Sequence, residues 1–225
     1  MNQRLIASLG AVASLALVLS GCAGGTDDTS SETTEAATAE ESATAEETAL
    51  VCEGSFAVMA PLTGGAASIG QEQMNFARLA AEDFNSANGS SYTLVESDTQ
   101  LDAGQASTQA SSIVSDSAIL GVVGPAGSQE VSAVGPAFAD AGIAYVSASA
   151  TNSDLTNGDN PGFFRVIPTD AAQGPTVGGF ITDEIGASNV VILQEKTDYG
   201  VGLSQSVADA LEASGASVEV IAVPE

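Results

Sequence analysis

From residue 55 onward, short apolar runs alternate with longer segments in which apolar side chains recur at helical spacing. Apolar runs bounded by Gly, Pro or polar residues are typical of buried strands. Strands that alternate with helices form parallel sheets, because each helix returns the chain in a right-handed crossover. We therefore expect an α/β fold, a parallel sheet flanked by helices. The predicted strands are 55–61, 92–97, 118–124, 142–147, 163–168, 189–194 and 217–223.

Helical periodicity fills the segments between these strands. Asp102 is a candidate N-cap for the second helix, because its carboxylate can accept from a free backbone N–H of the first turn. The third helix, Ser128–Ala141, should be interrupted at Pro136, which cannot donate a backbone hydrogen bond. The predicted apolar helix faces are Phe76, Leu79, Ala80 and Phe84; Ala106, Ala110, Ile113 and Val114; Val177, Phe180, Ile181 and Ile185; and Leu203, Val207 and Leu211.

Polar residues follow most of the predicted strands. In open α/β sheets ligands bind beyond the carboxyl ends of the strands, at the point where the strand order reverses. The stretch VSASATNSDLT, residues 146–156, follows one strand and is rich in hydroxyl and amide side chains. These side chains either satisfy a turn and cap a helix or form the polar floor of a ligand cleft.

The composition excludes several classes of function. The 225 residues include 29 acidic and 4 basic side chains, for a net charge of −25, and no His. Nucleic acid is excluded as a partner, because phosphate binding needs clustered Lys and Arg. Without His the chain can build neither a Ser-His-Asp nor a Cys-His catalytic set. No dinucleotide or P-loop motif is present. We expect a protein that is not an enzyme and needs no cofactor or metal.

Residues 1–22 read as an export signal. Arg4 precedes an apolar run, Leu5–Val18, and the run is followed by the sequence LSGC, which ends at Cys22. This ending resembles the lipobox of bacterial lipoproteins, in which the Cys becomes lipid-modified. The alternative is an uncleaved membrane anchor, since the run approaches the length needed to span a bilayer.

The next segment, 23–50, has eight acidic residues, no basic residue and little apolar bulk. It cannot bury enough apolar surface to offset its ordering entropy, so we expect a disordered acidic tether. The compact part should begin near residue 51. Cys52 is the only Cys after Cys22, and it is either free or paired with a partner outside this sequence.

Four stretches in this order resemble the Leu/Ile/Val-binding proteins, the periplasmic receptors of branched-chain amino-acid ABC transporters. They are APLTGGAASIGQEQMNFARLAAEDFN, VVGPAGSQEVSAVGPAFADAGIAYVSASATNSDLT, FFRVIPTDAAQG and KTDYGVGLSQSVADAL. The resemblance implies the type I periplasmic-binding-protein fold, two similar lobes that close on a ligand around a hinge. The first lobe would be complete at 51–168. The second would begin at 169–225 and be only partial, so we expect a fragment or a truncated reading frame.

The resemblance also implies a binding site. Ser128 would meet the ligand carboxylate at a helix N-terminus, although it could also be a simple N-cap. The carbonyl of Ser149, next to Ala150, would accept from the ligand ammonium. Thr151 would bond both ligand groups, although turn chemistry is its alternative. Tyr199 would pack over the ligand from the second lobe, or else be an exposed loop residue.

The sequence departs from the family pattern at three places. Ile69 stands where relatives often have an aromatic residue that walls the ligand side chain, so an aliphatic side chain would still fit. Ser90 and Ser91 stand where some relatives have a Cys that pairs with a residue like Cys52. The acidic residue that usually meets the ammonium from the second lobe would lie beyond Glu225.

The resemblance thus predicts an extracytoplasmic solute-binding lipoprotein, on the outer face of the cytoplasmic membrane or in the periplasm. It would capture a branched-chain amino acid or a related amide, deliver it to an ABC permease and be anchored to the membrane through Cys22. The alternative is an extracellular sensor domain that acts on a signalling partner through the same closure.

Overall fold

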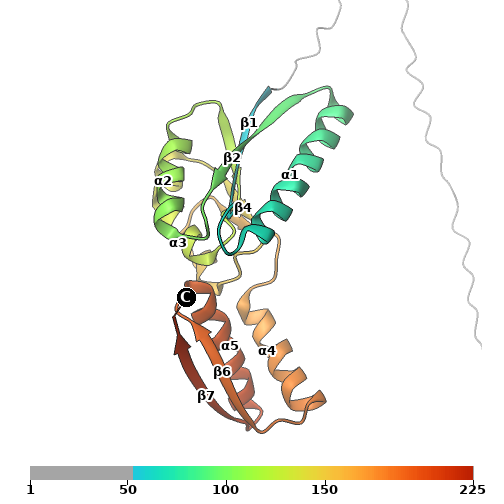
Figure 1. Cartoon of the computed structure of the whole chain (residues 1–225), viewed down its shortest axis with the longest axis vertical. Coiled ribbons are helices and arrows are strands. Elements are labelled where there is room, and N and C mark those ends of the chain that lie inside the picture. The colour runs from blue at the N-terminus through green and yellow to red at the C-terminus, as the bar shows by residue number, and fades with distance from the viewer. Residues whose placement is uncertain (1–52, 225) are drawn as a thin grey trace, which may run out of the picture. The chain divides into compact units, whose positions relative to one another are not determined.

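The structure is a computed structural model that describes residues 53–224 (Figure 1). The predicted signal peptide, the lipidation site Cys22, the acidic tether and Cys52 lie outside these residues. No helix within 53–224 combines the length and the apolar character needed to cross a membrane.

The first part of the described chain forms a five-stranded parallel sheet in the order β2-β1-β3-β4-β5. The interior strand β1 is apolar in its second half, where residues 57–60 are buried. The edge strand β2 instead alternates between more and less exposed residues. The α/β prediction is confirmed. The strands are β1 Glu53–Ala60, β2 Ser91–Asp98, β3 Ile119–Val123, β4 Tyr145–Ser147 and β5 Phe163–Arg165.

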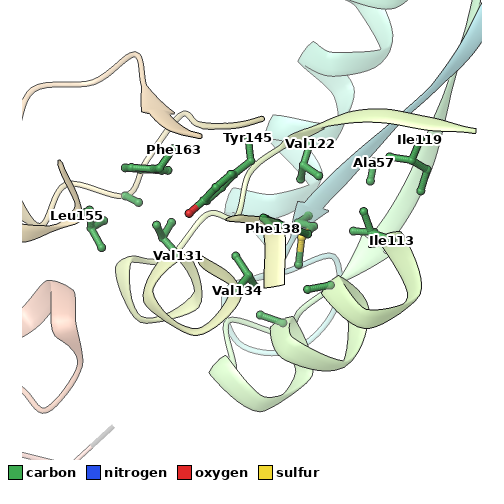
Figure 2. Close-up of a cluster of buried hydrophobic side chains, with 14 residues drawn as sticks. Ala57, Ile113, Ile119, Val122, Val131, Val134, Phe138, Tyr145, Leu155 and Phe163 are labelled. Carbon is green, nitrogen blue, oxygen red and sulfur yellow. The ribbon is translucent and has the colours of Figure 1, made fainter. Parts of the chain in front are cut away.

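Helices cover both faces of this sheet (Figure 1). Helices α2, Ala103–Val114, and α3, Ser128–Ala141, lie on one face, and α1, Ala67–Asn88, lies on the other. The main hydrophobic core lies under α2 and α3, where the rings of Phe138 and Tyr145 meet edge to face at 5.0 Å (Figure 2).

The second helix agrees with its prediction in all but one residue. Asp102 caps α2, its carboxylate accepting from the Gln105 N–H at 2.7 Å. Ala106, Ala110 and Ile113 are buried in the core. Val114 is the exception, because it lies at the exposed rim.

The predicted interruption of α3 at Pro136 is wrong. The helix continues through this residue to Ala141. Pro136 removes one intrahelical hydrogen bond, but the fully buried side chains of Val131, Val134 and Phe138 pack the helix against the sheet on both sides of it. Tertiary packing therefore outweighs the local preference.

The predicted apolar face of the first helix is exposed. The exposed fraction is 65% for Phe76 and 53% for both Leu79 and Phe84. Gly70 and Met74 are the buried positions of α1. The helix packs on the sheet through these two residues, and near its C-terminus Asn85 exchanges hydrogen bonds with the backbone of Tyr92 in β2. Within residues 53–224 no second helix covers the apolar stripe, which therefore stays largely exposed.

The second part of the described chain contains a two-stranded parallel sheet of β6, Asn189–Glu195, and β7, Ser217–Val223. Helix α5, Asp198–Ala213, packs on this sheet, and α4, Asp170–Gly179, packs on α5 (Figure 1). A π-helical turn at 180–184 extends α4. From α5, Val207, Ala208 and Leu211 are buried.

Candidate functional site

The loop after β4 is held against the loop between β3 and α3. The Ser147 hydroxyl donates to the Pro125 carbonyl at 2.6 Å and accepts from the Ala150 N–H at 3.0 Å. The Ser149 hydroxyl donates to the Ala126 carbonyl at 2.7 Å. These two hydroxyl groups therefore serve the turn, which was one of the two readings left open by the sequence.

Ser128 lies at the first turn of α3 and is 1% exposed. The N-cap is Gly127, whose N–H donates to the Glu130 carboxylate at 2.6 Å, so Ser128 is not the N-cap. Its hydroxyl instead accepts from the Asn152 N–H at 3.2 Å. The Ser128 N–H has no hydrogen-bond partner among the described residues, and it lies at the positive end of the helix dipole.

Two buried polar side chains face each other beside this loop. Thr151 is 4% exposed and Asp170 is 1% exposed. The Asp170 N–H donates to the Thr151 carbonyl at 2.9 Å. Within residues 53–224 the Thr151 hydroxyl and both Asp170 carboxylate oxygens have no hydrogen-bond partner. A buried carboxylate without a partner is costly, so this pair is the unusual feature of the region.

The surroundings of Asp170 set its protonation. Burial raises the pKa of the Asp170 carboxyl above its ordinary value of 3.8. The Thr151 hydroxyl is close enough to the carboxylate to oppose that rise without meeting hydrogen-bond geometry, and the Arg165 charge opposes it as well. Gly202 of α5 approaches from the other side, where a Cβ atom would lie 2.7 Å from both an Asp170 carboxylate oxygen and the Asn152 amide nitrogen. A glycine is therefore needed for α5 to pack this closely.

Ile69 and Tyr199 lie on helices that reach the same loop through neighbouring residues. Ile69 is half-exposed in the first turn of α1, and one turn later Gln73 donates to the Ser149 hydroxyl at 2.9 Å. Tyr199 is 41% exposed at the start of α5. Asp198, the residue before Tyr199, accepts from the Asn152 side chain through its backbone carbonyl at 2.7 Å.

A polar cavity of about 580 Å³ lies next to this region. None of the six predicted binding residues lines it. Its carboxylates are largely paired: Asp198 accepts from Ser132 at 2.9 Å, and Asp159 accepts from Asn157 at 2.9 Å. We place the candidate site at Thr151 and Asp170 instead, because there two buried polar side chains without partners lie together beside the loop after β4. The other buried side chains with unpartnered polar atoms, Thr99, Gln129, Glu130 and Tyr145, do not belong to this loop.

Residues 55–224 match the family model described as periplasmic binding protein. The chain belongs to this family. It is 32% identical over 165 residues to the leucine-specific-binding protein of Salmonella typhimurium, covering 72% of this chain and 44% of that protein. The leucine-binding protein of Thermotoga maritima superposes with a TM-score of 0.72 at 26% identity, covering 76% of this chain and 49% of that one.

This chain has the fold of these proteins, which is the type I periplasmic-binding-protein fold. A solute-binding protein from R. palustris, solved in complex with 4-hydroxybenzoate, has a similar fold. It superposes with a TM-score of 0.68 at 21% identity, and the match covers 77% of this chain and 47% of that one. The chain spans about half the length of the relatives it matches. The family resemblance predicted from the sequence is confirmed.

The sequence analysis did not identify Asp170 as a site residue. The residue follows β5 at the carboxyl edge of the sheet, in the first turn of α4. Its position just beyond a strand end was a usable signal, because ligands of open α/β sheets bind beyond the carboxyl ends of the strands. Nothing in the sequence indicated that an acidic residue in a chain with 29 of them would be fully buried.

Proposed function

We propose that this chain forms part of an extracytoplasmic solute-binding protein that captures a branched-chain amino acid and delivers it to an ABC permease. The observation that carries the proposal is the buried pair of Thr151 and Asp170, whose polar side-chain atoms lack partners within residues 53–224. An ammonium group bound there would supply the counter-charge and the hydrogen bonds that offset their burial.

The neighbouring groups have the chemistry needed for the rest of an α-amino acid. The Ser149 carbonyl has no hydrogen-bond donor among the described residues and would accept from the ammonium together with Thr151. The Ser128 N–H would donate to the carboxylate, which the α3 dipole also favours. Ile69 would contact the ligand side chain and Tyr199 would cover the ligand from α5.

Binding can be tested by titrating leucine, isoleucine, valine, small amides and 4-hydroxybenzoate into the ¹⁵N-labelled protein. We expect leucine to shift the amide resonances of Ser128 and Thr151. Thr151→Val and Asp170→Asn should each weaken binding by about tenfold to a hundredfold, because a charged ligand group loses a partner while partly buried.

Thr176→Val and Asp140→Asn are matched controls, because both residues are exposed on helices away from the loop. They should bind leucine like the wild type. Leucine affinity unchanged in both Thr151→Val and Asp170→Asn would contradict the assigned site. Binding of 4-hydroxybenzoate in preference to every amino acid would contradict an ammonium site at Asp170.

The membrane anchor is a separate part of the proposal and rests on the LSGC sequence ending at Cys22. Mass spectrometry of the protein from a bacterial membrane fraction should find a diacylglyceryl group on Cys22. Cys22→Ala should remove the lipid and release the protein from the membrane. A mature N-terminus elsewhere, without lipid, would contradict the anchor.

A further inference from the structure

Arg165, the last residue of β5, reaches across to the loop after β4. Its Nη1 group donates to the Ala150 carbonyl at 3.2 Å and to the Asn152 carbonyl at 2.7 Å. Its Nη2 group donates to the Thr156 hydroxyl at 2.7 Å. One guanidinium therefore holds the backbone on both sides of Thr151.

The third carbonyl of this stretch is held as well, because the Thr151 carbonyl accepts from the Asp170 N–H at 2.9 Å. Three consecutive carbonyls, 150 to 152, are thus tied down by β5 and the start of α4. The Thr151 side chain is thus fixed in place, while its hydroxyl group has no partner within the described residues.

Arg165 is also the nearby positive charge for Asp170. The two side chains form no direct ion pair, yet the guanidinium charge acts on the carboxylate through a poorly solvated region. The other groups packed around Asp170, Thr151 and Asn152 from the loop and Gly202 from α5, carry no charge. The ion pair formed by Arg78 lies elsewhere, on the exposed surface with Glu96.

We propose that Arg165 is the positioning residue of the ligand site: its fork fixes the loop around Thr151, and it provides the counter-charge near Asp170. This inference rests on the proposed function, since it assigns a role within the same site. The phenyl ring of Phe163 lies 5.7 Å from the guanidinium carbon and helps to hold the side chain.

Lysine could not replace this arrangement. A guanidinium presents several donors in a rigid plane, whereas an ammonium is a single point on a flexible stem and cannot span two carbonyls and a hydroxyl group. Arg165→Lys therefore removes the fork and keeps the charge. Arg165→Gln removes both, so the two variants separate the two parts of the role.

The first measurement needs no ligand. We expect carbon-detected NMR titration to give an Asp170 carboxyl that titrates at a higher pH in Arg165→Gln than in the wild type, and near the wild-type pH in Arg165→Lys. Both variants should shift the Thr151 and Asn152 amide resonances. Arg78→Gln, on the exposed surface, is the matched control and should change neither.

The second measurement is the leucine dissociation constant from pH 4 to pH 8. Ammonium binding needs the ionised carboxylate, so affinity should fall as pH drops through the Asp170 titration. Arg165→Lys should weaken binding about tenfold with an unchanged midpoint. Arg165→Gln should weaken it further and move the midpoint to higher pH, which loss of loop structure alone would not do.

Equal losses in the two variants with unchanged midpoints would overturn the charge role, and wild-type affinity in both would overturn the positioning role. Wild-type protein that binds no amino acid, with the ligand-free NMR changes still present, would overturn the proposed function and not the contacts of Arg165. If Arg165→Gln does not fold, Arg165→Lys alone still tests the fork through its tenfold loss.

Discussion

The two faces of the five-stranded sheet are both covered by helices that show clear apolar periodicity, but they are buried to very different degrees. Under α2 and α3 the side chains of Ile113, Val131 and Phe138 are inaccessible to solvent. Beside α1, Phe76 and Phe84 stay exposed and border an apolar groove of about 730 Å³. Two adjacent helices bury each other's stripes, whereas a single helix buries only the part that touches the sheet.

The contrast should be largest for equivalent aromatic truncations on the two faces. Phe138→Ala should lower the free energy of unfolding by about 3–5 kcal/mol, because it opens a cavity in a close-packed core. Phe76→Ala should change it by about 1 kcal/mol or less, because this ring is exposed. Urea unfolding measures both, and similar losses would show that the α1 stripe is buried in solution.

A second prediction concerns how α1 is attached. A Cβ atom on Gly70 would lie 2.1 Å from the Pro61 carbonyl oxygen, so Gly70→Ala must push the helix away from the sheet. We expect a loss of about 1–3 kcal/mol in unfolding free energy. Gly65→Ala is the control, because its Cβ would meet nothing within 4 Å. Equal effects would mean that Gly70 is not the contact that sets the position of α1.

The smallest effect should come from the charge buried at the start of α3. Burial raises the pKa of the Glu130 carboxyl above its ordinary value of 4.5. The folded state therefore binds this proton more tightly than the unfolded state does. The resulting stabilisation is fully present at pH values below the pKa of Glu130 in the unfolded chain, and it is lost as the pH rises through the pKa in the folded protein. Glu130→Gln should therefore become more stable relative to the wild type as the pH rises from 4 to neutral.

Gln keeps an acceptor for the Gly127 N–H, so the start of α3 is preserved in that variant. Glu72→Gln on the exposed side of α1 should leave unfolding free energies within about 0.5 kcal/mol at each pH. The prediction would be contradicted if the unfolding free energy of Glu130→Gln, minus that of the wild type, fell as the pH rises.

Local signals predicted local structure well. The Asp102 cap depends on a carboxylate three residues before a free N–H, and the buried face of α2 depends on spacing alone. The interruption at Pro136 was wrong because residues far along the chain pack around α3. The exposed stripe of α1 could not be predicted either, since periodicity marks the apolar face without revealing whether anything covers it.

The binding candidates divide in the same way. Ser128, Ser149 and Thr151 could be expected at one edge, because the carboxyl ends of parallel strands meet there. Asp170 and Arg165 could not be found by spacing. Their importance depends on burial and on contacts with a loop 13 to 19 residues away in the sequence.

By itself the sequence determined the alternation of strands and helices, and with it a parallel sheet whose polar strand ends lie together. Only the tertiary structure decided which of those polar groups find partners. Ser147 and Ser149 bond to carbonyls of the neighbouring loop, whereas Thr151 and Asp170 are buried facing each other with their polar atoms unpaired in the described residues. The physical reason is that a hydrogen bond needs a donor and an acceptor within about 3 Å, and in this loop the two come from segments folded together from distant parts of the chain.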